Sequence, residues 1–265
     1  MSEYSEAYMQ AKHQPAPKYA DAMDSVFAQI QRGELLPPRG QQAVNVGLVA
    51  HALTDSKIDP PHYRYYHWVV DRFLAQTPIH ELSAQLIGMA FVSANLLQTP
   101  LPQPLTLNPW QAPQMGAWPL ASKQAVVIEN NGVFIWLHHL HPEWPLINQG
   151  GNDFQAVYVR LLQQYVKRGL SLTYLGDLDA TGIRIADTLR RQLPICRTFL
   201  DLQSPTNVSL WLSQFGKYDS KRTKSQNIED EELRQEMVSI SVQQRFVEQE
   251  QLIGEYERLI ADWLR

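Results

Sequence analysis

From residue 120 onward the sequence alternates short apolar runs with amphipathic stretches, and this alternation constrains the fold more than any other feature. Strands are predicted where the apolar runs are short: 125–129, 145–150, 171–177 and 195–200. Helices are predicted between and after them, at 152–169 (with Asn152 or Asp153 as cap), 181–193 and 204–216. Strands that alternate with helices indicate βαβ units, and therefore an α/β fold with a mostly parallel sheet. Functional residues of such sheets lie at the carboxyl ends of the strands.

The residues before this region predict a separate, mainly helical part. Six prolines fall within residues 99–119, and proline lacks the backbone donor that helices and central strands need. We therefore expect a proline-rich linker at 99–119, a module at 1–98 and a catalytic domain at 120–265 with a helical tail. Helical spacing of apolar residues in the module occurs at 21–30, 44–53, 63–74 and 79–97. This pattern fits either a small helical module or a winged helix.

Composition narrows the function classes. The chain of 265 residues carries 23 Lys and Arg against 27 Asp and Glu, a net charge of −4. This balance argues against a strongly cationic nucleic-acid binder but permits a local basic patch. Cys196 is the only cysteine, which excludes an intrachain disulfide framework and a Cys-rich zinc site. No apolar run is long enough to span a membrane and the N-terminus lacks a signal-peptide core, so we expect a soluble cytoplasmic protein.

Three carboxylates stand where this fold places a functional site. Glu129 ends one predicted strand, and Asp177 and Asp179 follow another. Carboxylates that lie close together repel one another, and oxygen ligands without Cys or His suit Mg²⁺ or Mn²⁺. Such ions organise phosphoryl transfer. The alternative interpretation is that Asp-Leu-Asp-Ala-Thr-Gly is only a polar turn and helix cap. The chain lacks GxxxxGK[ST] and GxGxxG, which argues against a nucleoside triphosphatase and a dinucleotide dehydrogenase.

Four segments resemble the Toprim domain of topoisomerases, primases and related nucleases, and more narrowly the carboxyl-terminal domain of the Wadjet nuclease subunit JetD. They are VVIENNGVF (126–134), INQGGNDF (147–154), TYLGDLDATGIRIADTLRRQLP (173–194) and FLDLQSPTNVSLW (199–211). The resemblance covers roughly residues 120–265 and implies a Toprim-like, Rossmann-type domain. It implies that Glu129, Asp177 and Asp179 bind the metal and catalyse. By weaker matches, it adds Asp201 and Glu250 to the metal ligands.

Basic residues near the acidic cluster are candidates for DNA contacts. Residues 217–224 contain Lys217, Lys221, Arg222 and Lys224, and Arg184 lies near the start of the helix after the aspartates. A flexible basic loop beside a metal site could contact the DNA backbone, whereas a solvated loop is the default interpretation.

The sequence therefore predicts a Mg²⁺- or Mn²⁺-dependent DNA endonuclease of Toprim type, in bacterial defence against plasmids or phage. One alternative is a topoisomerase-type transesterase that attacks DNA with Tyr65 or Tyr66, next to Arg64. A second is a non-catalytic Toprim-like subunit that binds DNA or a partner ATPase. Expected partners are DNA, a condensin-like SMC ATPase complex and a second copy of the chain, without a membrane.

Overall fold

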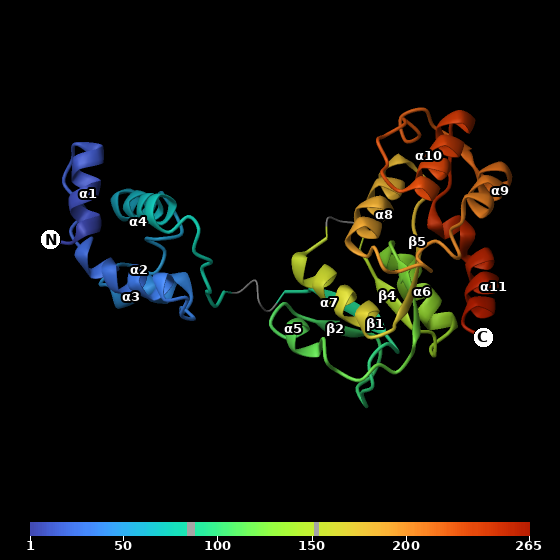
Figure 1. Cartoon of the computed structure of the whole chain (residues 1–265), viewed down its shortest axis with the longest axis horizontal. Coiled ribbons are helices and arrows are strands. Elements are labelled where there is room, and N and C mark those ends of the chain that lie inside the picture. Colours follow the sequence, from blue (N-terminus) through green and yellow to red (C-terminus); the bar gives the residue numbers. More distant parts are fainter. Residues whose placement is uncertain (84–87, 151–153) are drawn as a thin grey trace. The chain divides into compact units, whose positions relative to one another are not determined.

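The chain divides into two compact units in the computed structural model, Met1–Ile87 and Gly88–Arg265 (Figure 1). The structure describes residues 1–83, 88–150 and 154–265.

The first unit is helical. Its elements are α1 (Glu3–Lys12), the 3₁₀ helix η1 (Asp21–Met23), α2 (Asp24–Gln31), α3 (Arg39–Asn45) and α4 (Pro60–Phe73). Ser2 caps α1, and Asp59 caps α4 just before two prolines, a position where a missing backbone donor costs nothing. The predicted helices at 21–30 and 63–74 are confirmed. The prediction at 44–53 is wrong, because α3 ends at Asn45 and turns follow.

The winged-helix alternative has no support in the first unit. Its described residues contain one isolated bridge, between Leu36 and Glu81, and no strand. Aromatic side chains fill the core instead: Tyr8 and Phe27 pack against Tyr65 of α4, and Phe27 also contacts Tyr66. The unit is therefore a small bundle organised around the aromatic face of α4.

The second unit begins earlier than predicted, and residues 99–119 belong to it. Strand β1 (Phe91–Ala94) replaces the carboxyl-terminal part of the helix expected at 79–97, of which residues 84–87 lie outside the described residues. The expected linker contains strand β2 (Leu105–Leu107) and helix α5 (Ala112–Met115). The three residues of β2 contain no proline and pair with β1, and α5 has its proline in the first turn, where no backbone donor is needed.

A five-stranded sheet forms the core of the second unit, in the order β2-β1-β4-β3-β5. The central strands β3 (Gln124–Ile128), β4 (Leu146–Asn148) and β5 (Ser171–Leu175) are parallel, whereas β1 pairs antiparallel with β2 and β4. Ile128 lies opposite both Asn148 and Leu175, so the three parallel strands end at the same edge. The predicted α/β fold is confirmed, with an antiparallel pair added at one side.

Helices cover both faces of this sheet. Helix α6 (Asn131–Leu140) connects β3 to β4, and α7 (Ala156–Lys167) leads from β4 back past β3 to β5. Because these right-handed crossovers run in opposite directions, α6 and α7 lie on opposite faces. Helix α8 (Ala180–Gln192) packs beside α7, and α11 (Ile253–Trp263) packs beside α6 (Figure 1). The predicted caps of α7, Asn152 and Asp153, lie outside the described residues.

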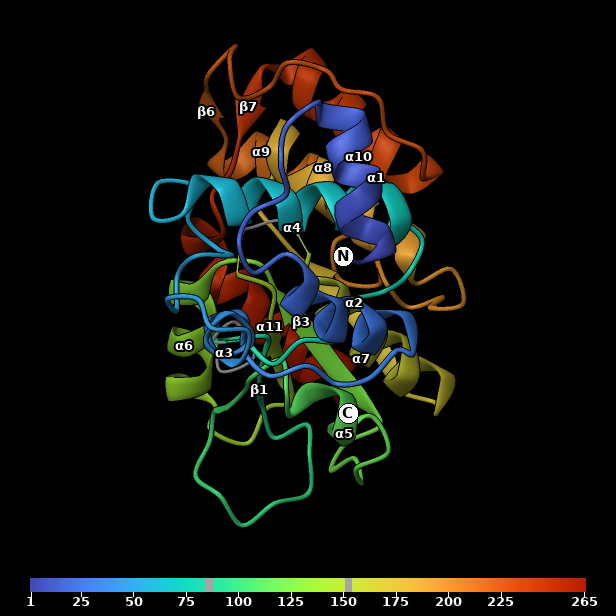
Figure 2. The same ribbon diagram turned by 90° about the vertical axis from the view of Figure 1, so that its left-hand side faces the viewer.

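The carboxyl-terminal third adds a small layer next to β5. It contains α9 (Pro205–Phe215), β6 (Lys217–Tyr218), α10 (Glu231–Gln243), β7 (Arg245–Phe246) and the 3₁₀ helix η3 (Gln249–Leu252). Strands β6 and β7 pair antiparallel beside α9 and α10 (Figure 2). None of the described helices is long and apolar enough to cross a membrane.

The strand predicted at 195–200 is wrong. This segment forms turns and joins β5 by the single backbone bond from Tyr174 N–H to the Phe199 carbonyl, 2.8 Å. The Leu172 carbonyl instead accepts from side chains, the Thr198 hydroxyl at 2.8 Å and the Cys196 thiol at 3.3 Å. Side chains therefore satisfy the outer edge of β5 where a further strand was expected.

Candidate metal centre

Glu129 follows β3 directly and lies almost completely inside the protein, with 6% of its surface exposed. Its Oε2 accepts the Tyr174 hydroxyl at 2.9 Å and the Asp177 N–H at 3.3 Å. Burial raises the pKa of this carboxyl to about 7, and the charges of Asp177 and Asp179 act in the same direction. Glu129 forms no ion pair with any residue of the described chain, so its ionised form has no cation to stabilise it.

Asp177 lies beside Glu129, two residues after β5. Its Oδ1 accepts the Gln249 N–H at 2.9 Å. Burial raises the pKa of the Asp177 carboxyl, and the negative charges of Asp179 and Glu250 add to this rise. The predicted neighbourhood of Glu129 and Asp177 at the ends of adjacent parallel strands is therefore present.

Two glycines allow the Asp-x-Asp segment to fold this tightly. A Cβ at Gly176 would overlap the Glu129 carboxylate and the Tyr174 ring, and a Cβ at Gly182 would overlap the Asp177 carbonyl. The two outer glycines of Gly-Asp-Leu-Asp-Ala-Thr-Gly therefore permit the close approach of β5, β3 and the start of α8.

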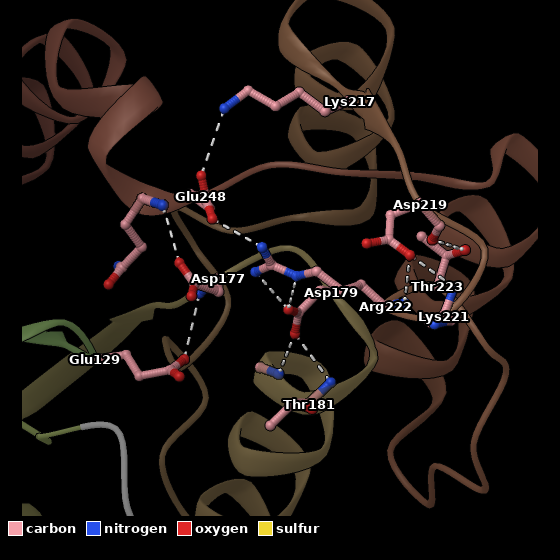
Figure 3. A network of polar contacts seen from close by, with 12 residues as sticks. Glu129, Asp177, Asp179, Thr181, Lys217, Asp219, Lys221, Arg222, Thr223 and Glu248 are labelled. Carbon is pink, nitrogen blue, oxygen red and sulfur yellow. Dashed lines mark hydrogen bonds and ion pairs between the residues drawn. The ribbon is translucent and has the colours of Figure 1, made fainter.

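Asp179 has a different environment from the other two carboxylates (Figure 3). It caps α8, where its Oδ1 accepts the N–H groups of Thr181 at 2.9 Å and Gly182 at 2.8 Å. Its Oδ2 accepts two hydrogen bonds from Arg222, at 2.9 Å from Nε and 2.7 Å from Nη2. Both oxygens of Asp179 are thus engaged. The structure therefore shows Asp179 as a helix cap that also forms an ion pair with Arg222.

The two weaker predicted ligands, Asp201 and Glu250, lie in different places. Asp201 accepts the Trp263 indole N–H at 3.0 Å, and the Trp263 carbonyl accepts from Gln124 at the opposite end of β3 from Glu129. Asp201 therefore does not join the cluster. Glu250 does lie at its rim, where its Oε1 accepts the Asn130 side-chain amide at 2.8 Å.

Gln249 is a site residue that the sequence analysis did not identify. It is fully buried. Its backbone N–H binds Asp177, and its Oε1 accepts the Asn130 N–H at 2.8 Å. It therefore connects the segments that follow β3 and β5. The one sequence signal was its place beside Glu250 in VEQEQ, and no pattern distinguishes a buried glutamine there from an exposed one.

The predicted DNA-binding residues also divide into two groups. Arg222 is ion-paired, and Lys217 lies 3.5 Å from Glu248. The side chains of Arg184, Lys221 and Lys224 are exposed and make no hydrogen bond or ion pair with other residues in the described ranges. The basic loop is ordered by Asp219, whose Oδ1 accepts the N–H groups of Lys221 at 2.8 Å and Arg222 at 3.3 Å.

Of the three predicted metal ligands, Glu129 and Asp177 lie together, whereas Asp179 is paired with Arg222. Within residues 1–83, 88–150 and 154–265, no group of three or more His, Cys, Asp or Glu side chains is arranged to hold a metal ion. However, Glu129 Oε1 and Asp177 Oδ2 accept no hydrogen bond from any described residue. Mg²⁺ commonly binds through one or two carboxylates and keeps several waters. The pair therefore fits one hard cation, whereas Asp179 is committed to Arg222.

The tyrosines of the transesterase alternative are inaccessible. Tyr65 and Tyr66 are 0% and 1% exposed, and neither hydroxyl has a hydrogen-bond partner among the described residues. Burial raises the pKa of both phenols, which disfavours the phenolate that would attack phosphorus. These residues form the core of the first unit.

Comparison with known proteins identifies a family. A family model described as "Wadjet protein JetD, C-terminal" matches residues 86–260. The match includes every residue of the acidic cluster, and it begins at the boundary between the two units, before β1. The search of the curated proteins finds no match.

Proposed function

The chain belongs to the Wadjet JetD C-terminal family, and from this premise we propose that it is a metal-dependent DNA endonuclease of the Wadjet defence system. The observation that carries the proposal is the pair Glu129 and Asp177. Glu129 is buried and Asp177 is half-buried, and their carboxylates lie together at the ends of adjacent parallel strands. Each has an oxygen that accepts no hydrogen bond from the described chain. Such a pair is unfavourable without a cation.

Glu129 and Asp177 would hold Mg²⁺ or Mn²⁺. When bound, the ion supplies positive charge for the scissile phosphate and activates water near neutral pH. The chain's own contribution is to fix the two carboxylates. Tyr174 and Gln249 orient them through hydrogen bonds, and the buried surroundings weaken solvent screening.

The exposed cations supply the proposed contact to DNA. Lys221 and Lys224 extend from the ordered loop near Arg222, and Arg184 lies in the first turns of α8. Side chains without an intramolecular partner can neutralise phosphates without breaking an ion pair first. They would position DNA by its backbone and carry no sequence preference.

A cleavage assay tests this function. Purified protein with Mg²⁺ or Mn²⁺ is incubated with linear, relaxed and supercoiled DNA. The wild type should cut, Asp177→Ala should not, and Asp201→Ala should cut like the wild type because Asp201 lies at the other end of β3. DNA binding without any cleavage, unaffected by Glu129→Gln, would instead identify a non-catalytic subunit.

We also propose two partners. A condensin-like SMC ATPase complex would present DNA in a bent or looped form, and a second copy of the chain would supply a second site for cutting both strands. Adding the ATPase complex should increase cleavage of looped DNA, and light scattering should detect a dimer. A monomer with and without DNA would contradict the second partner.

A further inference from the structure

Arg222 is held more firmly than any other predicted DNA-binding residue. Its Nε and Nη2 donate to Asp179 Oδ2, and its Nη1 donates to Glu248 Oε1 at 2.8 Å (Figure 3). The flat guanidinium lies 3.9 Å from the centre of the Phe246 ring. A guanidinium is suited to such a site because its planar fork binds carboxylates and stacks on aromatic rings.

The backbone of Arg222 is fixed as well. Its N–H donates to Asp219, and its carbonyl accepts the N–H of Ala180, the first residue of α8, at 2.9 Å. The residue therefore belongs to the start of α8 as much as to its own loop. Lys221, its neighbour, is exposed and has no side-chain partner among the described residues. Arg222, unlike Lys221, is therefore fixed in the site by both its side chain and its backbone.

This placement decides how many cations the cluster can take. Asp179 has both oxygens occupied, one by α8 and one by Arg222. A divalent ion on Asp179 would face the guanidinium at close range, and the two positive charges would repel. Glu129 and Asp177 make no hydrogen bond or ion pair with Arg222, whose charge acts on Asp177 only through space and partly offsets the rise that burial causes in its pKa.

We infer that Arg222 takes the position on Asp179 that a second divalent ion would otherwise occupy, so that the site binds one ion, on Glu129 and Asp177. This inference rests on the proposed metal-dependent function. Arg222 is thus a positioning residue that replaces an exchangeable cation by a fixed one. Three of its five N–H donors are used by the described chain, and 31% of its side chain is exposed. The remaining donors suit a phosphate oxygen.

The stoichiometry of Mn²⁺ binding to the full chain tests this inference. Calorimetry and the spin-resonance signal of free Mn²⁺ should give one ion for the wild type and none for Asp177→Asn. Arg222→Ala frees Asp179 and Glu248 and should bind two ions, while Arg222→Lys restores a fixed positive charge and should return to one. Lys221→Ala, the matched loop control, should bind one.

Thermal melting supplies the second readout. Without metal, Arg222→Ala should melt lower than the wild type, and Mn²⁺ should raise its melting temperature more than that of the wild type. If that variant does not fold, Arg222→Gln removes the charge while keeping a side chain that can hydrogen-bond. Two ions on the wild type, or one ion on a folded neutral variant, would overturn the inference alone. No ion on the wild type would overturn the metal-dependent function together with it.

Discussion

The two halves of the acidic cluster differ in whether a positive side chain balances their negative charge. In one half, buried Glu129 and half-buried Asp177 lie side by side and receive hydrogen bonds, but neither forms an ion pair in the described chain. In the other half, Asp179 and Glu248 share Arg222, and Lys217 adds a second positive charge to Glu248. The carboxylates of Asp179 and Glu248 are thus paired with cations in the folded chain, whereas those of Glu129 and Asp177 are not. Stability and activity should therefore respond in opposite ways to changes in the two halves.

The largest expected effect is on cleavage by Asp177→Asn. The amide keeps an acceptor for Gln249 but removes a charged oxygen ligand, so cleavage with Mg²⁺ should fall by about 100-fold or more, roughly 3 kcal/mol of activation free energy. The unfolding free energy without metal should stay level or rise slightly, because one source of repulsion is gone. Cleavage rates and urea melts of the same preparations measure both. A variant that is less stable but still cuts would refute the role assigned to Asp177.

Asp179→Ala should have its main effect on stability. It removes the α8 cap and leaves Arg222 without its main partner, so the unfolding free energy should fall by about 2 to 4 kcal/mol. Thr181→Ala is the control, since it changes the same turn without touching the ion pair. A stable Asp179→Ala protein would show that the two halves do not differ as the structure indicates.

The stability of the metal-free protein should depend on pH through Glu129. Its pKa is raised from 4.5 to about 7 in the folded state, so between these values the folded form holds a proton that the unfolded form has lost. The unfolding free energy should therefore fall as the pH rises from about 4.5 to 7, by about 3 kcal/mol, and stay level above. Metal affinity should change in the opposite direction, because binding needs the ionised carboxylate.

Melts across this pH range, for the wild type and Glu129→Gln, check the prediction. The glutamine variant should lose most of the slope and all response to Mn²⁺. An unchanged slope would assign the titration to another group.

The smallest effect is expected outside the cluster, at the tyrosines of the first unit. Tyr65→Phe and Tyr66→Phe remove buried hydroxyls without partners in the described chain, so stability should change by less than about 1 kcal/mol. Cleavage should be unchanged, and denaturing gels should show no covalent protein–DNA adduct. An adduct lost in either variant would restore the transesterase alternative.

The sequence predicted the parts of the fold that local periodicity controls. β3, β5, α7 and α8 follow directly from short apolar runs and amphipathic spacing. β1 and β2 were missed because four- and three-residue strands beside prolines carry almost no periodic signal, and only pairing with each other and with β4 defines them. The turns at 195–200 were mistaken for a strand for a different reason. They are buried beside β5, and a buried turn can show the same short apolar run as a strand.

The part of the candidate site that lies at the ends of strands was predictable from the sequence. Glu129 and Asp177 meet because β3 and β5 are adjacent and parallel. The ion pair between Asp179 and Arg222 was not predictable from the sequence. These residues are 43 positions apart, and their contact depends on how the basic loop folds against α8. Asp201 was added by a weaker match to the family, in which this Asp follows a strand. Here residues 195–200 form turns, and Asp201 accepts the Trp263 indole N–H away from the cluster.

The contacts of Gln249 have a consequence for the timing of activity during synthesis. Its backbone fixes Asp177, which precedes it by 72 positions, and its side chain fixes the residue after Glu129, 119 positions earlier. A ribosome therefore makes both acidic residues long before it makes the residue that joins them. A nascent chain that ends before Gln249 has the acids without the support that orients them. The proposed DNA cleavage would therefore depend on a residue that the ribosome adds 72 positions after Asp177.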